Sequence, residues 1–195
     1  MENCECYRRN ENTMKATGIV RRIDDLGRVV IPKEIRRTLR IREGTPLEIF
    51  TDREGEIILK KYSPIGELGP FAKQYAESLA QTTGLTVCVC DRDQVIAVAG
   101  GSRRDLLGKN ISKQLETVIE DRENILVDNK EYKYISVTEG DNEELFGQAI
   151  SPIICEGDAI GAVVILGKEA RMMLGETEKK LAISAAGFLG KQMEQ

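Results

Sequence analysis

The stretch from Asp24 to Arg37 reads DDLGRVVIPKEIRR, and three local signals follow one another in it. The aspartates and glycine of residues 24–27 are typical of a turn. Residues 28–31 predict a short strand, which Pro32 ends because proline has no N–H to donate to a sheet. The same proline favours the start of a helix, and Ile35 and Leu39 lie four residues apart along it. We therefore predict a turn, a strand and a short helix over residues 33–39.

The flanking segments predict a small module rich in strands. Residues 17–23 favour a strand before the turn, and residues 47–50 and 57–60 flank Asp52–Gly55, which is typical of a hairpin. Residues 14–62 are too few to bury a large apolar core, because a lone domain below about 60 residues is marginally stable. We expect the module to be oligomeric, with a second copy covering its strand edges.

Charge is distributed unevenly along the chain. The 195 residues carry a net charge of −4, which for the whole chain argues against a nucleic-acid binder. Residues 14–62, however, hold 12 Lys and Arg against 8 Asp and Glu, a net of +4, and residues 15–42 reach +6. Residues 63–195 sum to −7 and residues 1–13 to −1. A basic module is therefore joined to an acidic one.

The module boundaries follow from composition. Residues 1–13 are polar and aperiodic, so we predict a disordered leader, and Met14 is a candidate for the native start. Ser63–Gly66 is a Pro/Gly break, which predicts a linker over residues 63–69 between a domain at 14–62 and a second at 70–195. The leader lacks the apolar core of a secretory signal. The sequence has no apolar run long enough to predict a membrane span. We expect a cytoplasmic protein.

The acidic module predicts an α+β sandwich. Apolar residues four apart predict a helix from Pro70 to near Gly84, another around residues 111–119, and a last one over residues 176–193. Strands are predicted over residues 85–91, 94–100, 134–137, 147–154 and 160–166. Helices at both ends of a meander-type sheet give this architecture.

Residues 14–37, and above all the D-x-L-G-R-V-V-I-P-x-E-I-R-R motif, resemble the AbrB family of bacterial transition-state regulators. The resemblance continues through residues 47–49 and 57–62. It implies an all-β swapped-hairpin barrel in which two chains interleave their strands, and hence an obligate dimer that binds double-stranded DNA. Indirect readout of DNA shape is the expected mode, since the module shows no helix-turn-helix or zinc-finger motif.

The acidic module resembles the sensor half of two-domain sporulation regulators of the AbrB type, and that half is similar to GAF domains. The matching segments are residues 68–73, Cys90–Asp93, 157–165 and 185–189. The resemblance implies a tetramer formed through the C-terminal domain, control of late sporulation genes, a nucleoid-associated protein in the cytoplasm, and a small-molecule ligand of unknown identity.

Basic residues of the first module are the candidate DNA contacts, because Lys and Arg neutralise backbone phosphates. The family resemblance implies four arginines, whose planar forks grip phosphate or a guanine edge. These are Arg21, Arg28, Arg36 and Arg37. Further candidates for phosphate contacts, with solvated surface charge as the alternative, are Lys15, Arg22, Lys60 and Lys61.

Enzyme chemistry finds little support in the composition. The chain has no histidine, which removes Ser-His and Cys-His pairs and His-containing zinc sites. The five cysteines, two C-x-C pairs and a single Cys155, are odd in number and do not suggest a disulfide framework. Two interpretations are open for Cys88, Cys90 and Cys155. They have metal or redox roles, or they are small buried hydrophobic residues. We predict no catalytic residue, metal or cofactor.

Two further segments and two alternative functions remain open. Residues 100–104, GGSRR, suggest an anion cradle or a strand-to-helix turn, and the stripe Leu181, Ala185, Leu189 and Met193 suggests core or an oligomer seam. An antitoxin is one alternative function, because AbrB-like barrels also serve antitoxins, although these usually end in a short flexible tail. An enzyme in the acidic module is the other.

Overall fold

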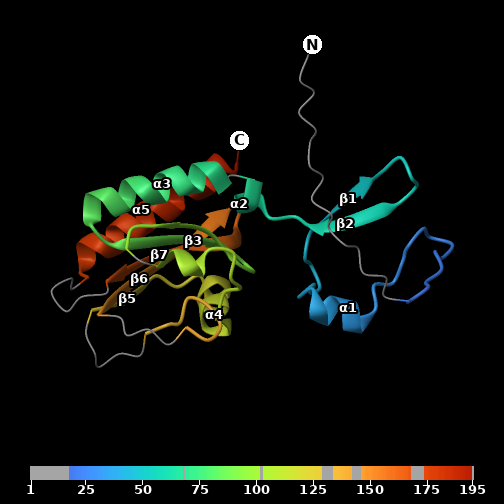
Figure 1. The fold of residues 1–195 in the computed structure, drawn as a ribbon, viewed down its shortest axis with the longest axis horizontal. Coiled ribbons are helices and arrows are strands. Elements are labelled where there is room, and N and C mark those ends of the chain that lie inside the picture. The colour runs from blue at the N-terminus through green and yellow to red at the C-terminus, as the bar shows by residue number, and fades with distance from the viewer. Residues whose placement is uncertain are drawn as a thin grey trace, which may run out of the picture. The chain divides into compact units, whose positions relative to one another are not determined.

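The computed structural model describes residues 18–67, 69–101, 103–128, 134–141, 146–167 and 174–194 (Figure 1). The chain forms two compact units, residues 1–43 and 44–195. The predicted leader, residues 1–13, lies outside the described residues. The second unit includes the hairpin that the sequence assigns to the basic module, and the predicted domain boundary after residue 62 stays a prediction.

The first unit contains the predicted turn and helix. The Gly27 N–H donates to the Asp24 carbonyl at 3.0 Å, and Gly27 has φ +75°, a left-handed conformation that favours glycine. Helix α1, Lys33–Thr38, begins directly after Pro32. The strands predicted at 17–23 and 28–31 are not formed in this single chain, in which the described residues 18–31 are irregular or in a turn. A strand needs a neighbour to pair its backbone groups, and none is formed in the described part of this unit.

The predicted hairpin is confirmed. Strands β1, Leu47–Thr51, and β2, Ile57–Lys61, are antiparallel, with Leu47 opposite Lys61. The Asp52 carboxylate closes the turn, because one of its oxygens accepts the N–H groups of Glu54 and Glu56 at 3.0 and 2.9 Å.

The rest of the second unit is the α+β sandwich that the sequence predicts. Its sheet is antiparallel throughout, in the order β4-β3-β7-β6-β5. Helices α3 and α5 cover one face of the sheet and α4 the other (Figure 1). The elements are α2 (Pro64–Glu67), α3 (Gly69–Thr83), β3 (Thr86–Asp91), β4 (Val95–Ala99), a 3-10 turn (Arg103–Leu106), α4 (Lys113–Asp121), β5 (Ile125–Val127), β6 (Gly147–Cys155), β7 (Asp158–Gly167) and α5 (Glu176–Gln192).

Strand β3 separates two apolar cores. Val87 and Val89 face α3 and α5, whereas Cys88 and Cys90 lie in the core beneath α4. This alternation follows from the two-residue period of a strand. It confirms the interpretation of Cys88 and Cys90 as small buried residues, both with 0% of their surface exposed.

The prediction of a strand at residues 134–137 is wrong. The buried side chain of Gln148 donates its amide to the Ile135 carbonyl at 2.7 Å and accepts the Ile135 N–H at 2.9 Å. This side chain therefore satisfies the backbone groups that a neighbouring strand would otherwise pair. A three-residue strand at 125–127 forms the sheet edge instead.

The predicted linker at residues 63–69 includes a helical turn rather than only irregular chain. Helix α2 occupies residues 64–67, and Ile65 in it has 1% of its surface exposed. Proline ends the preceding strand but also suits the first turn of a helix, so the Pro/Gly break marks the start of a packed element.

Candidate nucleic-acid interface

Asp24 positions Arg28 within the motif of residues 24–37. One carboxylate oxygen of Asp24 accepts the N–H groups of Leu26 and Arg28 at 3.0 and 2.8 Å. The other accepts Nε of the Arg28 guanidinium at 2.8 Å. The turn therefore holds Arg28 by its Nε, while 69% of the Arg28 side-chain surface stays exposed. The two terminal amino groups of the fork remain available to a phosphate.

The same contacts change the titration of Asp24. The Arg28 backbone N–H, followed by the Arg28 guanidinium, holds the pKa of the Asp24 carboxyl below its ordinary value. The lowered pKa means that these contacts favour the ionised carboxylate, the form that accepts the hydrogen bonds of the turn.

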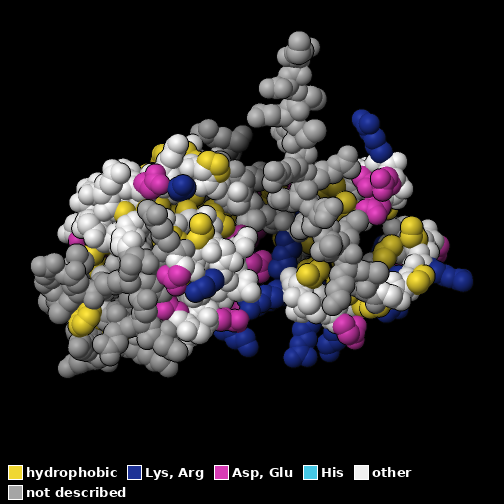
Figure 2. Space-filling model, in the orientation of Figure 1, with side chains coloured by type: hydrophobic (Ala, Val, Ile, Leu, Met, Phe, Trp, Pro, Cys, Tyr) yellow, Lys and Arg dark blue, Asp and Glu magenta, His cyan; other side chains and the backbone are white. Residues whose placement is uncertain are grey.

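Helix α1 presents Arg36 and Arg37. Neither is buried, and no residue of α1 is. Both lie in the last turn, where a cation suits the negative end of the helix. Dark-blue side chains project into solvent around α1 in Figure 2. Such a helix has a wholly exposed basic face, as a DNA contact requires.

Two arginines before the turn are exposed as well. Arg21 and Arg22 lie in the segment before the turn, and both side chains are solvent-exposed. Lys15 lies outside the described residues. Exposure is compatible with DNA contact and with solvated charge alike, so the roles of these residues stay predictions.

The two lysines at the end of β2 both have partners within the chain. The Lys60 Nζ lies 4.7 Å from the centroid of the Phe50 ring, a cation–π contact. The Lys61 Nζ lies 2.9 Å from a carboxylate oxygen of Asp93, with 25% of its own side chain exposed. Lys61 is thus less accessible than a typical phosphate-binding lysine.

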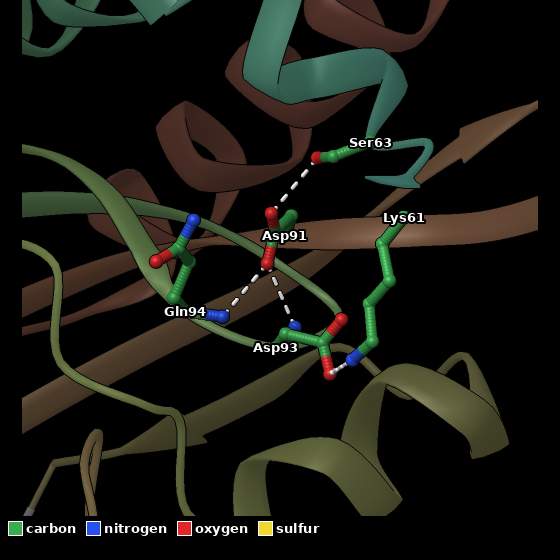
Figure 3. A network of polar contacts seen from close by, with 5 residues as sticks. All are labelled: Lys61, Ser63, Asp91, Asp93 and Gln94. Carbon is green, nitrogen blue, oxygen red and sulfur yellow. Dashed lines mark hydrogen bonds and ion pairs between the residues drawn. The ribbon is translucent and has the colours of Figure 1, made fainter. Parts of the chain in front are cut away.

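A polar network joins the end of the hairpin to the turn between β3 and β4 (Figure 3). The Ser63 hydroxyl donates to one carboxylate oxygen of Asp91 at 2.8 Å. The other oxygen of Asp91 accepts the backbone N–H groups of Asp93 and Gln94, both at 2.7 Å. Asp93 in turn bonds Lys61. The sequence indicated the Asp-Arg-Asp turn but not its hydrogen bond with Ser63. Ser63 and Asp91 are 28 positions apart in the chain, so no local pattern shows that the fold brings them together.

The glycines at 100 and 101 are required by packing. Both have positive φ, and a Cβ would collide with the Leu85 carbonyl at Gly100 and with the Thr86 hydroxyl at Gly101. This supports the turn interpretation of the GGSRR segment.

An open groove of about 560 Å³ between α3 and the end of β4 borders these glycines. Ser102 lies outside the described residues.

The apolar stripe of α5 belongs to the core of the chain. Ala185 and Leu189 are fully buried against the sheet, which confirms the core interpretation for these two residues. A different face of the helix is exposed: Phe188 stacks on Tyr75 of α3 at 5.2 Å between ring centroids, yet 39% of it is accessible. Ile183, elsewhere on the helix, is 40% exposed.

Exposed apolar side chains are concentrated in residues 18–62. Val20 is 90% exposed and Val30 70%. A soluble monomer rarely leaves so many large apolar side chains in water. The other large exposed apolar residues of this segment are Ile19, Ile23, Leu26, Val29, Leu39, Ile49, Phe50, Ile57, Leu59 and Tyr62.

Two family models match different parts of the chain. The family model for the C-terminal part of stage V sporulation protein T, described as a transcription factor, matches residues 67–194. The chain belongs to this family. It is a family of transcription factors and not of enzymes, so the enzyme alternative is set aside. A second model, for the bacterial antitoxin MazE, matches residues 20–67.

Two relatives from Bacillus subtilis (strain 168) cover different parts of the chain. Stage V sporulation protein T is 58% identical over 93% of this chain and all of its own length. Transition state regulatory protein AbrB is 67% identical over 51 residues, which are 26% of this chain and 52% of that protein. The prediction of an AbrB-type DNA-binding domain at the N-terminus is confirmed.

A solved structure supports the fold of the C-terminal domain. The GAF domain of a phosphoenolpyruvate-protein phosphotransferase from Coxiella burnetii superposes with a TM-score of 0.50 at 19% identity, over 65% of this chain and 82% of that one. This confirms the predicted GAF-like α+β fold. Among the described residues, none of the helices combines the length and apolarity needed to cross a bilayer.

Proposed function

We propose that this protein regulates late sporulation genes by binding double-stranded DNA as a dimer built through residues 14–62. The observation that carries the dimer is the exposed apolar surface of residues 18–62, with Val20, Leu26 and Val30 all more than two-thirds accessible. A second copy with the same surface offers the complementary apolar partner and the missing strand neighbours.

The proposed DNA contacts are Arg21, Arg28, Arg36 and Arg37. All four are exposed, and Asp24 orients Arg28 through its Nε. Two-fold symmetry presents each arginine twice. Lys15, Arg22 and Lys60 are further candidates for phosphate contacts, while the ion pair of Lys61 with Asp93 favours another role for that residue.

The C-terminal domain is proposed to join two such dimers into a tetramer. The supporting feature is the outer face of α3 and α5, where Phe71, Tyr75 and Phe188 form an aromatic cluster and Ile183 is exposed. Packing these helices against their copies removes that apolar surface from water. Binding of a small-molecule signal by this domain rests on the GAF-like fold alone, and a cytoplasmic, nucleoid-associated location follows from the DNA-binding role.

Multi-angle light scattering of the full chain, with a DNA-binding titration on the same sample, tests this proposal. We expect a mass of four times the 21.7 kDa chain and binding that weakens steeply with salt. A mass of one chain would refute both interfaces, and a mass of two chains would refute the tetramer. Salt-independent binding would refute the phosphate contacts.

The antitoxin alternative draws on the MazE model match at residues 20–67. Antitoxins of this type usually end in a short flexible tail, whereas this chain continues into a packed GAF-like domain with two cores. A toxin that copurifies with the native protein and loses activity in its presence would favour this alternative.

A further inference from the structure

Polar contacts hold the point at which the hairpin meets the GAF-like domain. Strand β2 ends at Lys61 and α2 begins at Pro64. Between them, Lys61 and Ser63 both reach the turn that connects β3 and β4, where they meet Asp93 and Asp91 (Figure 3). A passive tether has no need for two such contacts within three residues.

Asp91 is the fixed centre of this junction. Only 5% of it is exposed, and its carboxylate accepts three hydrogen bonds, two from backbone N–H groups of its own turn and one from Ser63. A buried carboxylate held by its own backbone cannot follow a moving partner without losing these bonds. Ser63 is therefore tied to a rigid point of the sheet.

Ser63 and α2 are held from the other side as well. The Ser63 hydroxyl accepts the Gly66 N–H at 3.1 Å, so the same group closes the turn of α2 and binds Asp91. Ile65 packs against the sheet, and a Cβ on Gly161 would collide with the Cys90 carbonyl and press on Ile65. The close fit leaves α2 little freedom to rotate.

Lys61 extends this fixation into the hairpin. Its ion pair with Asp93 is partly buried, with 25% and 37% of the two side chains exposed, so it is less screened than a surface pair. Lys61 also pairs across the hairpin with Leu47. Through this register, the contact of Lys61 with Asp93 anchors the base of both β1 and β2.

We propose that Lys61, Ser63, Asp91 and Asp93 form an orienting joint that holds the β1–β2 hairpin at a defined angle on the GAF-like domain. Lys61 is then a positioning residue and not a phosphate contact. This inference rests on the proposed DNA-binding tetramer, in which such a joint fixes the relative phase of the two DNA sites that one tetramer bridges.

The test uses full-length variants and two readouts. Asp93→Asn removes the ion pair without removing a basic residue, and Ser63→Ala removes the bond to Asp91. The first readout is hydrogen exchange of a peptide covering residues 61–67, where the loss of one such bond is expected to raise the rate about fivefold. Glu77→Gln, which breaks the exposed Lys73–Glu77 pair on α3, is the matched control and is expected to exchange as wild type.

The second readout is binding to DNA with two sites whose spacing is increased base pair by base pair. A fixed joint predicts affinity that oscillates with the helical repeat of about 10.5 base pairs. Asp93→Asn is expected to lose the oscillation while keeping single-site affinity and its salt slope. The double variant Lys61→Asp, Asp93→Lys restores the pair in reverse and is expected to recover the oscillation.

The outcomes separate the joint from the proposed function. Unchanged exchange in Asp93→Asn and Ser63→Ala would overturn the joint. An oscillation of affinity that survives in Asp93→Asn would also overturn the joint. A third such outcome is a Lys61→Met variant whose salt slope is flatter by about 0.9 per lysine removed, with no change in the matched Lys109→Met, because Lys61 would then bind phosphate. A wild-type protein that binds no DNA would refute the proposed function, and the exchange rates would still decide the joint.

Discussion

Replacing Arg36 by alanine is expected to flatten the salt dependence of DNA binding by a calculable amount. The four proposed arginines are exposed in each chain, so a dimer presents eight of them. If each neutralises one phosphate, the slope of log affinity against log salt is about −7, at about −0.9 per contact. Arg36→Ala removes two contacts per dimer and leaves a slope of about −5.

The difference is large enough to measure directly. Between 50 and 200 mM salt, wild-type affinity is expected to fall about 20,000-fold and that of Arg36→Ala about 2,000-fold. Fluorescence anisotropy with one labelled duplex, titrated at four or five salt concentrations, gives both slopes. The variant also binds more weakly than wild type at low salt, across unrelated DNA sequences, because phosphate contacts carry no base code.

Arg53→Ala is the matched control. Arg53 is also exposed, but it lies in the hairpin turn beside Asp52, Glu54 and Glu56, whose carboxylates make that turn acidic. We expect this variant to keep the wild-type slope. An Arg36→Ala slope equal to that of wild type would remove Arg36 from the interface. Equal flattening in both variants would show that overall charge, rather than a defined surface, controls binding.

Three other perturbations test separate parts of the structure. Ile183→Glu places a charge on the outer face of α5 and is expected to halve the mass seen by light scattering, and an unchanged mass would place the tetramer contact elsewhere. Gly190→Ala places a Cβ against the Ile154 carbonyl and is expected to lower the free energy of unfolding, measured in urea, by about 1–3 kcal/mol. The control Gly69→Ala meets open space and is expected to be near neutral. Equal stability of the two variants would contradict the close packing of α5 on β6. Because the folded pKa of Asp24 is lowered, its stabilisation of the turn is present above the ordinary aspartate pKa and lost as pH falls through the folded value. A carboxyl titration by NMR is expected to move back towards the ordinary value in Arg28→Ala, and an unmoved midpoint would be inconsistent with the contact.

Local patterns predicted most helices and strands of the second unit. The spacing of Phe71, Tyr75 and Leu79 predicted α3, and the hairpin followed from Asp52–Gly55 between two apolar runs. The wrong predictions fall where a residue distant in sequence determines the local structure. Residues 134–137 have the composition of a strand, but Gln148 occupies their backbone groups, and no local pattern contains that contact.

The candidate interface divides in the same way. The arginines of residues 21–37 were predicted from charge and motif, and the structure shows Arg21, Arg28, Arg36 and Arg37 exposed, as a phosphate contact requires. Lys61 has the same local signal as Lys60, yet Asp93 holds it. Neither charge nor spacing distinguishes a lysine that meets phosphate from one that meets a carboxylate 32 residues away.

The sequence by itself determined the two-module organisation, the basic character of one module and the family, since composition and the motif at residues 24–37 are local properties. Only the tertiary structure decided that residues 64–67 form a helical turn with Ile65 buried, and that Ala185 and Leu189 of α5 face their own core, leaving Phe188 and Ile183 partly exposed. The physical reason is that burial and hydrogen-bond partners depend on which segments the fold brings together, and these segments lie tens of residues apart along the chain.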